Sequence, residues 1–510
     1  MKLAFAPAYL VGLALVAVTP CIFAQNSSLP LSKSTTCDEK CQQSVQRGVT
    51  FEQESHAHTP LDDFYSIPAS FKPSMEPGTL LRVETHTNLI NYTVPAGLTM
   101  SRIMYTSQSL NGTIVPASAY VLWPYAPFEY TDKCSSNRKR GNKAEGKFPL
   151  VAWAHGTSGQ FVKCAPSNYR SLQYHFMAPY TLGLEGFAVV APDYAGLGVT
   201  TGPNGESSHA WGSSPAGAND VAYAIDAVRK AFPEYLATDG PFVAMGHSQG
   251  GSIMWAFAER QAKAPQAGYR GTIAISPPTR VVDILNSALA KIASLPASQL
   301  PAWALVTLGI QPKLIAAITT VYPSYNYSGM TPTSYDRWNN VMKPLQVCLP
   351  TENLAFNIPP NNLSASEIAK PNWTAHSTVL EWKDRVAVGG KKFKGPMLAI
   401  VGENDVIPLD ILDQDVDASC KVSKDQSLEM VTFQGSEHFP VIQTSRMRWM
   451  SWIKERISGR DANGDCAKVA MCGKKSVVKG FNSNYTVHSI TPNWLVQWVP
   501  TPQEMWKLAL

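Results

Sequence analysis

Short, mostly apolar runs alternate with segments of helical periodicity over the central and C-terminal parts of the chain. The runs are of strand length and lie at residues 148–153, 187–191, 241–245, 271–275, 396–401 and 428–433. Apolar positions recur at helical spacing within residues 217–231, and a last helix is expected near 445–457. Fully apolar strands separated by helices are typical of a parallel sheet that is buried on both faces. The pattern therefore predicts an α/β fold with a mostly parallel central sheet.

The N-terminal part of this pattern differs. Apolar and polar positions alternate within residues 79–125, which predicts antiparallel strands that open the sheet. Residues 25–60 are polar and irregular, and we expect a poorly ordered arm that is tied down by its cysteines. Residues 134–147 form a basic, glycine-containing insertion that we expect to be an exposed loop.

A long segment interrupts the sheet pattern between residues 279 and 395. Its apolar positions recur at helical spacing, which predicts a helical cap or lid. These apolar faces either line a substrate pocket or pack on the core, and the sequence leaves both alternatives open. Trp303 and Leu305 in this segment, with Tyr194 after an earlier strand, are candidate substrate-binding residues. The expected organisation is a signal peptide at 1–24, an arm at 25–75, a core at 76–278 and 396–460, the cap at 279–395 and a tail at 461–510.

The N-terminus indicates secretion. A short basic start is followed by an apolar stretch and a small-residue cleavage site before Gln25, which is typical of a signal peptide. Without Cys21, eight cysteines remain, an even number that fits disulfide bonding in an oxidising compartment. Proximity favours the pairs Cys37–Cys41, Cys466–Cys472, Cys134–Cys164 and Cys348–Cys420. Glycosylation sequons begin at Asn26, Asn91, Asn111, Asn326, Asn362, Asn372 and Asn484.

Composition narrows the class of partner. The 510 residues carry a net charge of +5, which is too diffuse over this length to indicate nucleic acid binding. The cysteines show no C-x-x-C spacing of the kind found in zinc sites, and no metal is expected. The acidic positions Asp410, Asp413, Asp415 and Asp417 are interpreted as a solvated helix face. Nothing in the sequence indicates the oligomeric state.

The motif Gly-His-Ser-Gln-Gly at residues 246–250 carries the strongest chemical signal. It follows an apolar strand and precedes a run of good helix formers, and a strand, G-x-S-x-G and helix together predict a nucleophile elbow at Ser248. The alternative is an ordinary strand-to-helix turn with a capping serine. The catalytic interpretation is favoured because both flanking elements are present.

A serine nucleophile needs a base, and the base needs an orienting acid. Three histidines follow Ser248, and only His438 lies between a predicted strand and the last helix. Asp405 follows the preceding strand and is favoured over Glu403 as the acid. Backbone N–H groups that stabilise an oxyanion are expected at Gln249, which follows the nucleophile, and in the 155–157 loop, where Thr157 is the first choice and Gly156 the second.

Taken together, these motifs resemble the secretory lipase (lipase-A-type) family of the α/β-hydrolase superfamily. The resemblance rests on the motifs at 153–157, 191–196, 246–251, 402–405 and 435–438 and covers about residues 75–460. It implies an eight-stranded core with a helical cap, hydrolysis of carboxylic esters without a cofactor, and Ser248, Asp405 and His438 as a triad. A small-molecule or lipid ester is then the expected substrate, with transient contact to a lipid interface. The alternatives are a carboxylesterase for cell-wall or aromatic esters and a hydrolase-fold binding protein.

Overall fold

The computed structural model describes residues 33–130, 147–200, 209–296, 300–356, 363–461 and 470–481. Its framework is a ten-stranded sheet in the order β1-β2-β3-β5-β4-β6-β7-β8-β9-β10. Strands β1 to β3 pair antiparallel with their neighbours, and every pairing from β5 to β10 is parallel. The strands are β1 (Leu80–Glu84), β2 (Leu98–Gln108), β3 (Ile114–Pro124), β4 (Leu150–Ala154), β5 (Ala188–Pro192), β6 (Phe242–His247), β7 (Tyr269–Ile275), β8 (Met397–Gly402), β9 (Leu428–Phe433) and β10 (Cys472–Val478). The predicted α/β class and the antiparallel opening are confirmed.

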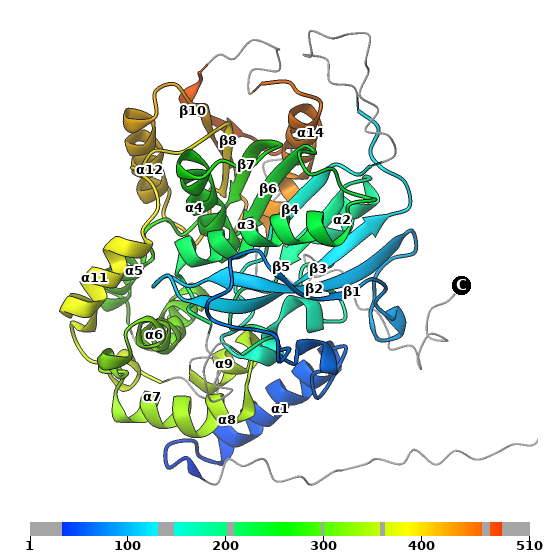
Figure 1. The fold of residues 1–510 in the computed structure, drawn as a ribbon. Helices are drawn as coiled ribbons and strands as arrows, with labels where there is room; N and C mark the ends of the chain where they lie inside the picture. The colour runs from blue at the N-terminus through cyan, green and yellow to red at the C-terminus, as the bar shows by residue number, and fades with distance from the viewer. Residues whose placement is uncertain are drawn as a thin grey trace, which may run out of the picture.

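Helices cover both faces of this sheet (Figure 1). In β4, Leu150 and Ala152 belong to one hydrophobic core, whereas Val151 and Trp153 belong to a second core. The first core includes α3 (Ser214–Ala231), α4 (Gln249–Lys263) and α12 (Leu409–Val422). The second includes α2 (Pro179–Leu184), α13 (Pro440–Thr444) and α14 (Arg446–Ile457). Because alternate side chains point to opposite faces of a strand, burial on both faces explains the continuous apolar runs.

The segment between β7 and β8 is helical. It contains α5 (Val281–Ala293), α6 (Ala302–Val321), α7 (Pro332–Arg337), α8 (Lys343–Leu345), α9 (Leu349–Phe356), α10 (Ala365–Ile368) and α11 (Ser377–Val386), with a π-helical turn at Trp338–Met342. We call residues 279–395 the cap. Its helices gather at one end of the molecule in Figure 1.

Helix α6 is the most apolar element of the cap. It continues through Pro312, where the apolar pattern is interrupted. Residues Trp303–Val321 are long and apolar enough to cross a membrane, but 67% of the most apolar window is buried inside the structure. Leu314 and Ile318 are fully buried, and the Lys313 ammonium pairs with Glu352 of α9 at 2.5 Å. Helix α6 is therefore placed as the core helix of the cap.

The expectation of an irregular N-terminal arm was wrong for α1 (Glu39–Ser55), a helix of 17 residues. Asp38 caps it by accepting a hydrogen bond from the Cys41 amide. The residues that it buries are Cys41, Ser44, Val45, Gly48, Val49 and Glu52. This stripe packs on α9 of the cap, where Glu52 accepts hydrogen bonds from the Cys348 and Thr351 amides. The stripe was missed because few of its members are apolar.

Three disulfides connect described residues. Cys37–Cys41 confirms the predicted pair. The predicted pairs Cys134–Cys164, Cys348–Cys420 and Cys466–Cys472 were wrong, because the structure joins Cys164 to Cys348 and Cys420 to Cys472. Both observed bonds join residues far apart in sequence, which proximity along the chain cannot indicate. Cys134 and Cys466 lie outside the described residues.

The C-terminal tail contributes a strand that was not predicted. Strand β10 pairs in parallel with β9 and is joined to α12 by the Cys420–Cys472 disulfide. The sheet therefore has ten strands and not the eight that the family resemblance implied. Lys475 of β10 also pairs with Asp413 and Asp417 of α12. Strand β10 is polar and half-exposed, so its sequence lacks the signal of a buried strand.

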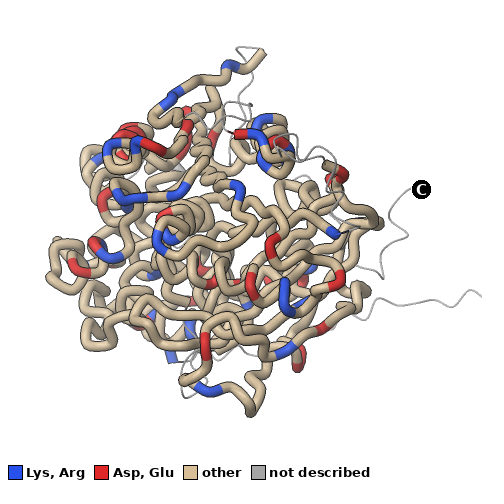
Figure 2. The backbone as a smooth tube through the Cα atoms, turned by 45° about the horizontal axis from the view of Figure 1, so that its top comes forward, with Lys and Arg blue, Asp and Glu red and all other residues tan. Residues whose placement is uncertain are grey.

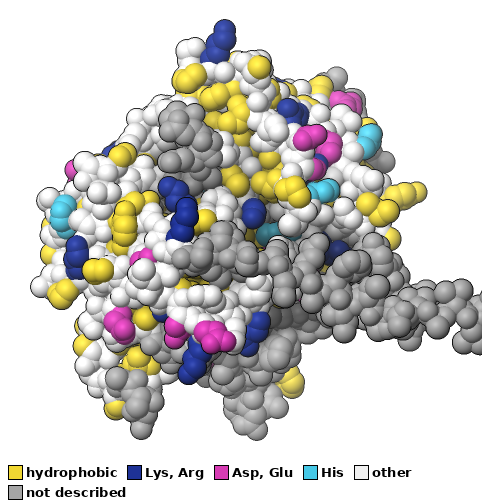
Figure 3. Space-filling view, turned by 90° about the horizontal axis from the view of Figure 1, so that it is seen from below, with side chains coloured by type: hydrophobic (Ala, Val, Ile, Leu, Met, Phe, Trp, Pro, Cys, Tyr) yellow, Lys and Arg dark blue, Asp and Glu magenta, His cyan; other side chains and the backbone are white. Residues whose placement is uncertain are grey.

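Acidic and basic residues are interspersed along the described chain (Figure 2). One acidic position departs from expectation: Asp415 is buried, and its carboxylate accepts a hydrogen bond from Thr279 and pairs with Arg280. Seen from below, hydrophobic and charged side chains share the face (Figure 3). Among the sequons, Asn111, Asn326 and Asn372 are exposed and Asn91 is half-exposed. Outside the described residues lie Asn26, Asn362, Asn484, the predicted signal peptide and residues 134–146 of the basic insertion.

Candidate active site

Ser248 lies in the sharp turn between β6 and α4. Its backbone has φ +57° and ψ −122°, in the region that non-glycine residues rarely adopt. The turn brings α4 close to the neighbouring strands. A Cβ at Gly250 would lie 2.0 Å from the Ala154 oxygen, and one at Gly251 would lie 2.5 Å from the Ile275 oxygen. Only glycine fits at these two positions, and the strained turn presents the Ser248 side chain above the sheet.

His438 and Asp405 meet Ser248 at the carboxyl ends of three parallel strands. His438 follows β9 and Asp405 follows β8. The His438 Nε2 atom lies 2.9 Å from Ser248 Oγ, and its Nδ1 atom lies 2.7 Å from Asp405 Oδ1. Because the carboxylate can only accept, Nδ1 carries the proton and Nε2 is left to accept from the serine hydroxyl. An imidazole in this position can take the serine proton as the hydroxyl attacks a carbonyl carbon.

The side chain of Asp405 is fully buried, and its carboxylate accepts several hydrogen bonds. Its Oδ1 also accepts from the Ile407 amide at 2.9 Å, and its Oδ2 accepts from Ser276 Oγ at 2.5 Å. Burial alone raises the pKa of Asp405, but the charge of His438 and the hydrogen bonds from His438, Ser276 and Ile407 together hold the pKa below its usual value. The carboxylate therefore stays ionised and can stabilise a protonated His438.

The backbone of His438 is held by a second histidine. His247 Nε2 donates to the His438 carbonyl at 2.8 Å, so its Nδ1 accepts from the Tyr174 hydroxyl at 2.8 Å. Burial lowers the pKa of His247 to about 3, which keeps the ring neutral. Sequence reasoning missed this contact, although His247 stands next to Ser248 in the G-x-S-x-G motif.

The predicted oxyanion donors lie beside the serine. Gln249 is the first residue of α4, and the first N–H groups of a helix have no partner within the helix. Gly156 approaches from the loop after β4, and a Cβ there would lie 3.3 Å from Ser248 Cβ. Thr157 follows, with its carbonyl accepting from Gln173 at 3.0 Å and its hydroxyl accepting from Trp211 at 2.8 Å. The structure thus brings both expected donor segments to the same turn.

The part of the chain that carries Ser248, Asp405 and His438 matches the model of a known family. The model of the alpha/beta hydrolase family matches residues 151–447, more than half of the chain. The chain belongs to the alpha/beta hydrolase family. A search of curated protein sequences finds no significant match to this hydrolase.

Solved structures resemble this alpha/beta hydrolase over most of its length. Lipase A from Candida antarctica is 14% identical with a TM-score of 0.60, and the alignment covers 85% of this chain and 92% of the lipase. The rice cell wall degrading esterase LipA from Xanthomonas oryzae is 17% identical with a TM-score of 0.53, and the coverage is 74% and 97%. A putative hydrolase from Legionella pneumophila is 16% identical with a TM-score of 0.50, covering 74% and 96%. At these identities the likenesses show the fold alone.

The three predicted substrate-binding residues lie in two parts of the structure, one after β5 and the other in the cap. Tyr194 is fully buried with φ +69°, and its hydroxyl donates to the His155 carbonyl at 2.9 Å. Trp303 and Leu305 lie near the start of α6, both half-buried, and Trp303 packs against the core. Tyr194 therefore stabilises the loop after β4 through this hydrogen bond. Trp303 and Leu305 stay candidates for substrate contact.

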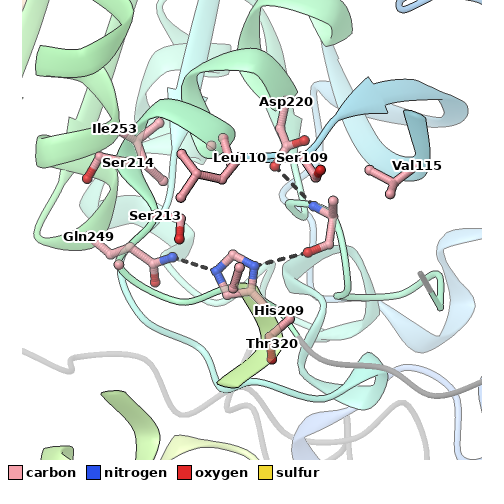
Figure 4. A pocket seen from close by; sticks show the side chains of 15 residues that line it. Ser109, Leu110, Val115, His209, Ser213, Ser214, Asp220, Gln249, Ile253 and Thr320 are labelled. Carbon is pink, nitrogen blue, oxygen red and sulfur yellow. Dashed lines mark hydrogen bonds between the residues drawn. The ribbon is translucent and has the colours of Figure 1, made fainter. Parts of the chain in front are cut away.

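A cavity of about 530 Å³, including its open mouth, lies next to Gln249 in this hydrolase (Figure 4). Its wall combines the N-terminal turns of α3 and α4 with the tip of the β2–β3 hairpin and Thr320 of the cap. The labelled lining residues in Figure 4 are Ser109, Leu110, Val115, His209, Ser213, Ser214, Asp220, Gln249, Ile253 and Thr320. Neither Trp303 nor Leu305 lines this cavity. Among the described residues, no cluster of three or more histidine, cysteine, aspartate or glutamate side chains is placed to hold a metal ion.

Proposed function

We propose that this hydrolase is a secreted serine esterase that cleaves carboxylic esters, with lipid or other hydrophobic esters as its substrates. The observation that carries the proposal is the chain of hydrogen bonds from Ser248 through His438 to the buried Asp405. The three disulfides between described residues fit secretion into an oxidising compartment. We expect the mature secreted protein to begin at Gln25.

The proposed reaction has two halves. Ser248 Oγ attacks the ester carbonyl carbon while His438 Nε2 takes the hydroxyl proton, and the carbonyl oxygen becomes an oxyanion held by the Gln249 amide and by that of Thr157 or Gly156. The bond to the alcohol then breaks, and His438 returns the proton to the leaving alkoxide. In the second half, water loses a proton to His438 as it attacks the acyl-enzyme. The bond between the acyl carbon and Ser248 Oγ then breaks, His438 returns the proton to Oγ, and the carboxylic acid leaves.

The preference for hydrophobic esters rests on the cap. Helix α6 of the cap is strongly apolar, and Trp303 and Leu305 near its start are proposed to contact the acyl chain. The similarity to lipase A from Candida antarctica supports this assignment, and we expect transient contact of this hydrolase with a lipid interface. Because each buried methylene contributes about 0.8 kcal/mol, kcat/KM should rise severalfold for each methylene until the pocket is filled.

A second candidate is an esterase for cell-wall or aromatic esters. It is favoured by the similarity to the rice cell wall degrading esterase from Xanthomonas oryzae. The two candidates differ in the expected ester profile. A rise from acetate to longer nitrophenyl esters supports the lipid assignment, whereas a flat alkyl series with faster hydrolysis of aromatic acyl esters supports the alternative.

The first test replaces the proposed nucleophile. Ser248→Ala should lower kcat for nitrophenyl butyrate by on the order of 10⁶, the loss known for a triad serine, and should leave folding and secretion intact. Ser294→Ala, at an exposed serine after α5, is the matched control and should stay fully active. A labelled fluorophosphonate should modify the wild type and not Ser248→Ala. Absence of labelling in the wild type would favour a hydrolase-fold binding protein.

A further inference from the structure

The side chain of Gln249 is tied to a histidine that the reaction does not use. Gln249 Nε2 lies 2.7 Å from His209 Nε2, and His209 Nδ1 lies 3.0 Å from the Ala195 carbonyl (Figure 4). Because that carbonyl can only accept, Nδ1 carries the proton, and Nε2 accepts from the Gln249 amide. Burial lowers the pKa of His209 to about 4, so the ring is neutral and keeps this acceptor at neutral pH.

His209 is itself held on two sides. The Ala195 amide donates to the buried Asp220 at 3.1 Å, which fixes the carbonyl partner of the histidine. The ring stacks on Tyr194 at 5.6 Å between centroids, and Tyr194 stacks in turn on His155 at 4.2 Å. A column of three rings therefore runs from His209 to the loop that carries Gly156 and Thr157.

Trp211, two residues after His209, contacts Thr157, the second proposed donor residue. Trp211 Nε1 donates to Thr157 Oγ1 at 2.8 Å, and both His209 and Trp211 are almost fully buried, at 5% and 4% exposure. We call residues 209–211 the clamp segment. It contacts the side chains of Gln249 and Thr157, the two residues whose backbone amides are the proposed oxyanion donors.

The cap covers the clamp segment. The Lys313 ammonium of α6 lies 5.9 Å from the centre of the Trp211 ring, and the His209 amide donates to the Gln160 carbonyl at 3.0 Å. Gln160 Nε2 donates in turn to the Lys313 carbonyl at 2.9 Å. The clamp segment is thus fixed between the catalytic edge of the sheet and the core helix of the cap.

We propose that His209 and Trp211 are positioning residues that align the two backbone donors of the oxyanion hole, at Gln249 and Thr157. The inference rests on the proposed ester hydrolysis. Substitution by any residue other than proline keeps the backbone N–H, but the direction of that N–H depends on what holds its residue. A displacement of about 1 Å in such a site lowers the rate about 10²-fold, and the donors act mainly in the transition state.

The test measures hydrolysis of nitrophenyl butyrate by two variants. His209→Leu removes the hydrogen bonds to Gln249 and to the Ala195 carbonyl, and Trp211→Phe removes the one to Thr157. Both should lower kcat about tenfold to 10²-fold and change KM little, since the donors are used in the transition state. A trifluoromethyl ketone, whose adduct with Ser248 places an oxyanion in the hole, should bind more weakly by the same factor as kcat/KM. His209→Gln, which keeps an acceptor for Gln249, should recover most of the activity.

A double-mutant cycle makes the test specific. Gln249→Leu keeps the backbone amide and loses only the side-chain tie, so it should resemble His209→Leu. The double variant should be hardly worse than either single variant. Additive losses would overturn the inference, because they would mean that the two side chains act independently.

His56→Leu controls for the general effect of removing a buried histidine. His56 is similarly buried and packs edge-on against Tyr169, far from the clamp segment in the chain. It should lower the melting temperature without the change in kcat. A wild type that hydrolyses esters through Ser248 is the reference for this comparison. If His209→Leu and Trp211→Phe have the same kcat/KM as that wild type, the inference is overturned. A wild type inert toward esters and fluorophosphonate would overturn the proposed function and this inference together.

Discussion

Gly156→Ala offers the sharpest test of how tightly the site is packed. A Cβ at Gly156 would lie 2.1 Å from the Tyr174 hydroxyl oxygen, 3.2 Å from Tyr174 Cζ and 3.3 Å from Ser248 Cβ. Ordinary contact begins near 3.4 Å, so the hydroxyl must retreat by about 1.3 Å. Tyr174 is only 2% exposed and its hydroxyl bonds to His247, which holds the His438 backbone.

The expected losses follow from that overlap. Overpacking a buried site lowers stability by about 1–3 kcal/mol. Shifting Tyr174 by about 1 Å also disturbs His247 and so the base, which predicts a fall in kcat/KM of about 10²-fold. Nitrophenyl butyrate hydrolysis measures the second effect, and thermal unfolding measures the first.

A second substitution should reverse the first. Tyr174→Phe removes the overlapping oxygen and leaves the nearest ring carbon at 3.2 Å, a contact that a small ring shift relieves. Tyr174→Phe alone loses one hydrogen bond to His247, so its activity should fall less than that of Gly156→Ala. The double variant should regain most of the activity that Gly156→Ala loses. If Gly156→Ala stays within threefold of wild type, or if Tyr174→Phe does not relieve it, the reasoning is refuted.

Two further predictions concern stability. Replacing Cys164 and Cys348 with alanine should lower the free energy of unfolding by about 2–5 kcal/mol. Replacing Cys37 and Cys41 should lower it less, because the first bond spans a sequence separation of 184 residues and the second a separation of 4. Equal losses in denaturant titrations would contradict this prediction. Burial raises the pKa of Glu52 to about 7, despite opposing hydrogen bonds from Thr351 and Cys348. The folded state therefore holds this proton more tightly than the unfolded state does. As a result, the free energy of unfolding should fall as the pH rises from about 4.5 to about 7. Glu52→Gln keeps an acceptor oxygen and should lose less stability between pH 4.5 and 7.5; an equal loss in both proteins would argue against the shift.

The parts of the fold that local sequence encodes could be predicted. Strands β4 to β9 are buried on both faces, so their apolar runs are visible without knowledge of their neighbours. Ser248, Asp405 and His438 could be chosen because each stands where a strand ends, and the carboxyl ends of parallel strands share one edge of the sheet. The hydrogen bonds that join them agree with that choice.

Other features depend on partners that are distant in the chain. Helix α1 buries Glu52 and Gly48, neither of which indicates a core position. The Cys348 and Thr351 amides donate to Glu52, and Thr351 packs so closely on Gly48 that a Cβ there would lie 2.5 Å from the Thr351 hydroxyl oxygen. Strand β10 has a polar sequence and is held by pairing with β9 and by a disulfide to α12. The histidines at 209 and 247 gain their contacts from segments tens to hundreds of residues away. No window of neighbouring residues contains that information.

The insertion of the cap between β7 and β8 also determines when the site can exist. Ser248 is synthesised before the cap, whereas Asp405 and His438 are synthesised after it. Domains fold progressively from the N-terminus during synthesis, and contacts across such long separations close late. A nascent chain that ends within the cap therefore carries a serine with no base. Chemistry that needs the Ser248–His438 pair becomes possible only when most of the chain has been synthesised. A product truncated within the cap should therefore have no esterase activity.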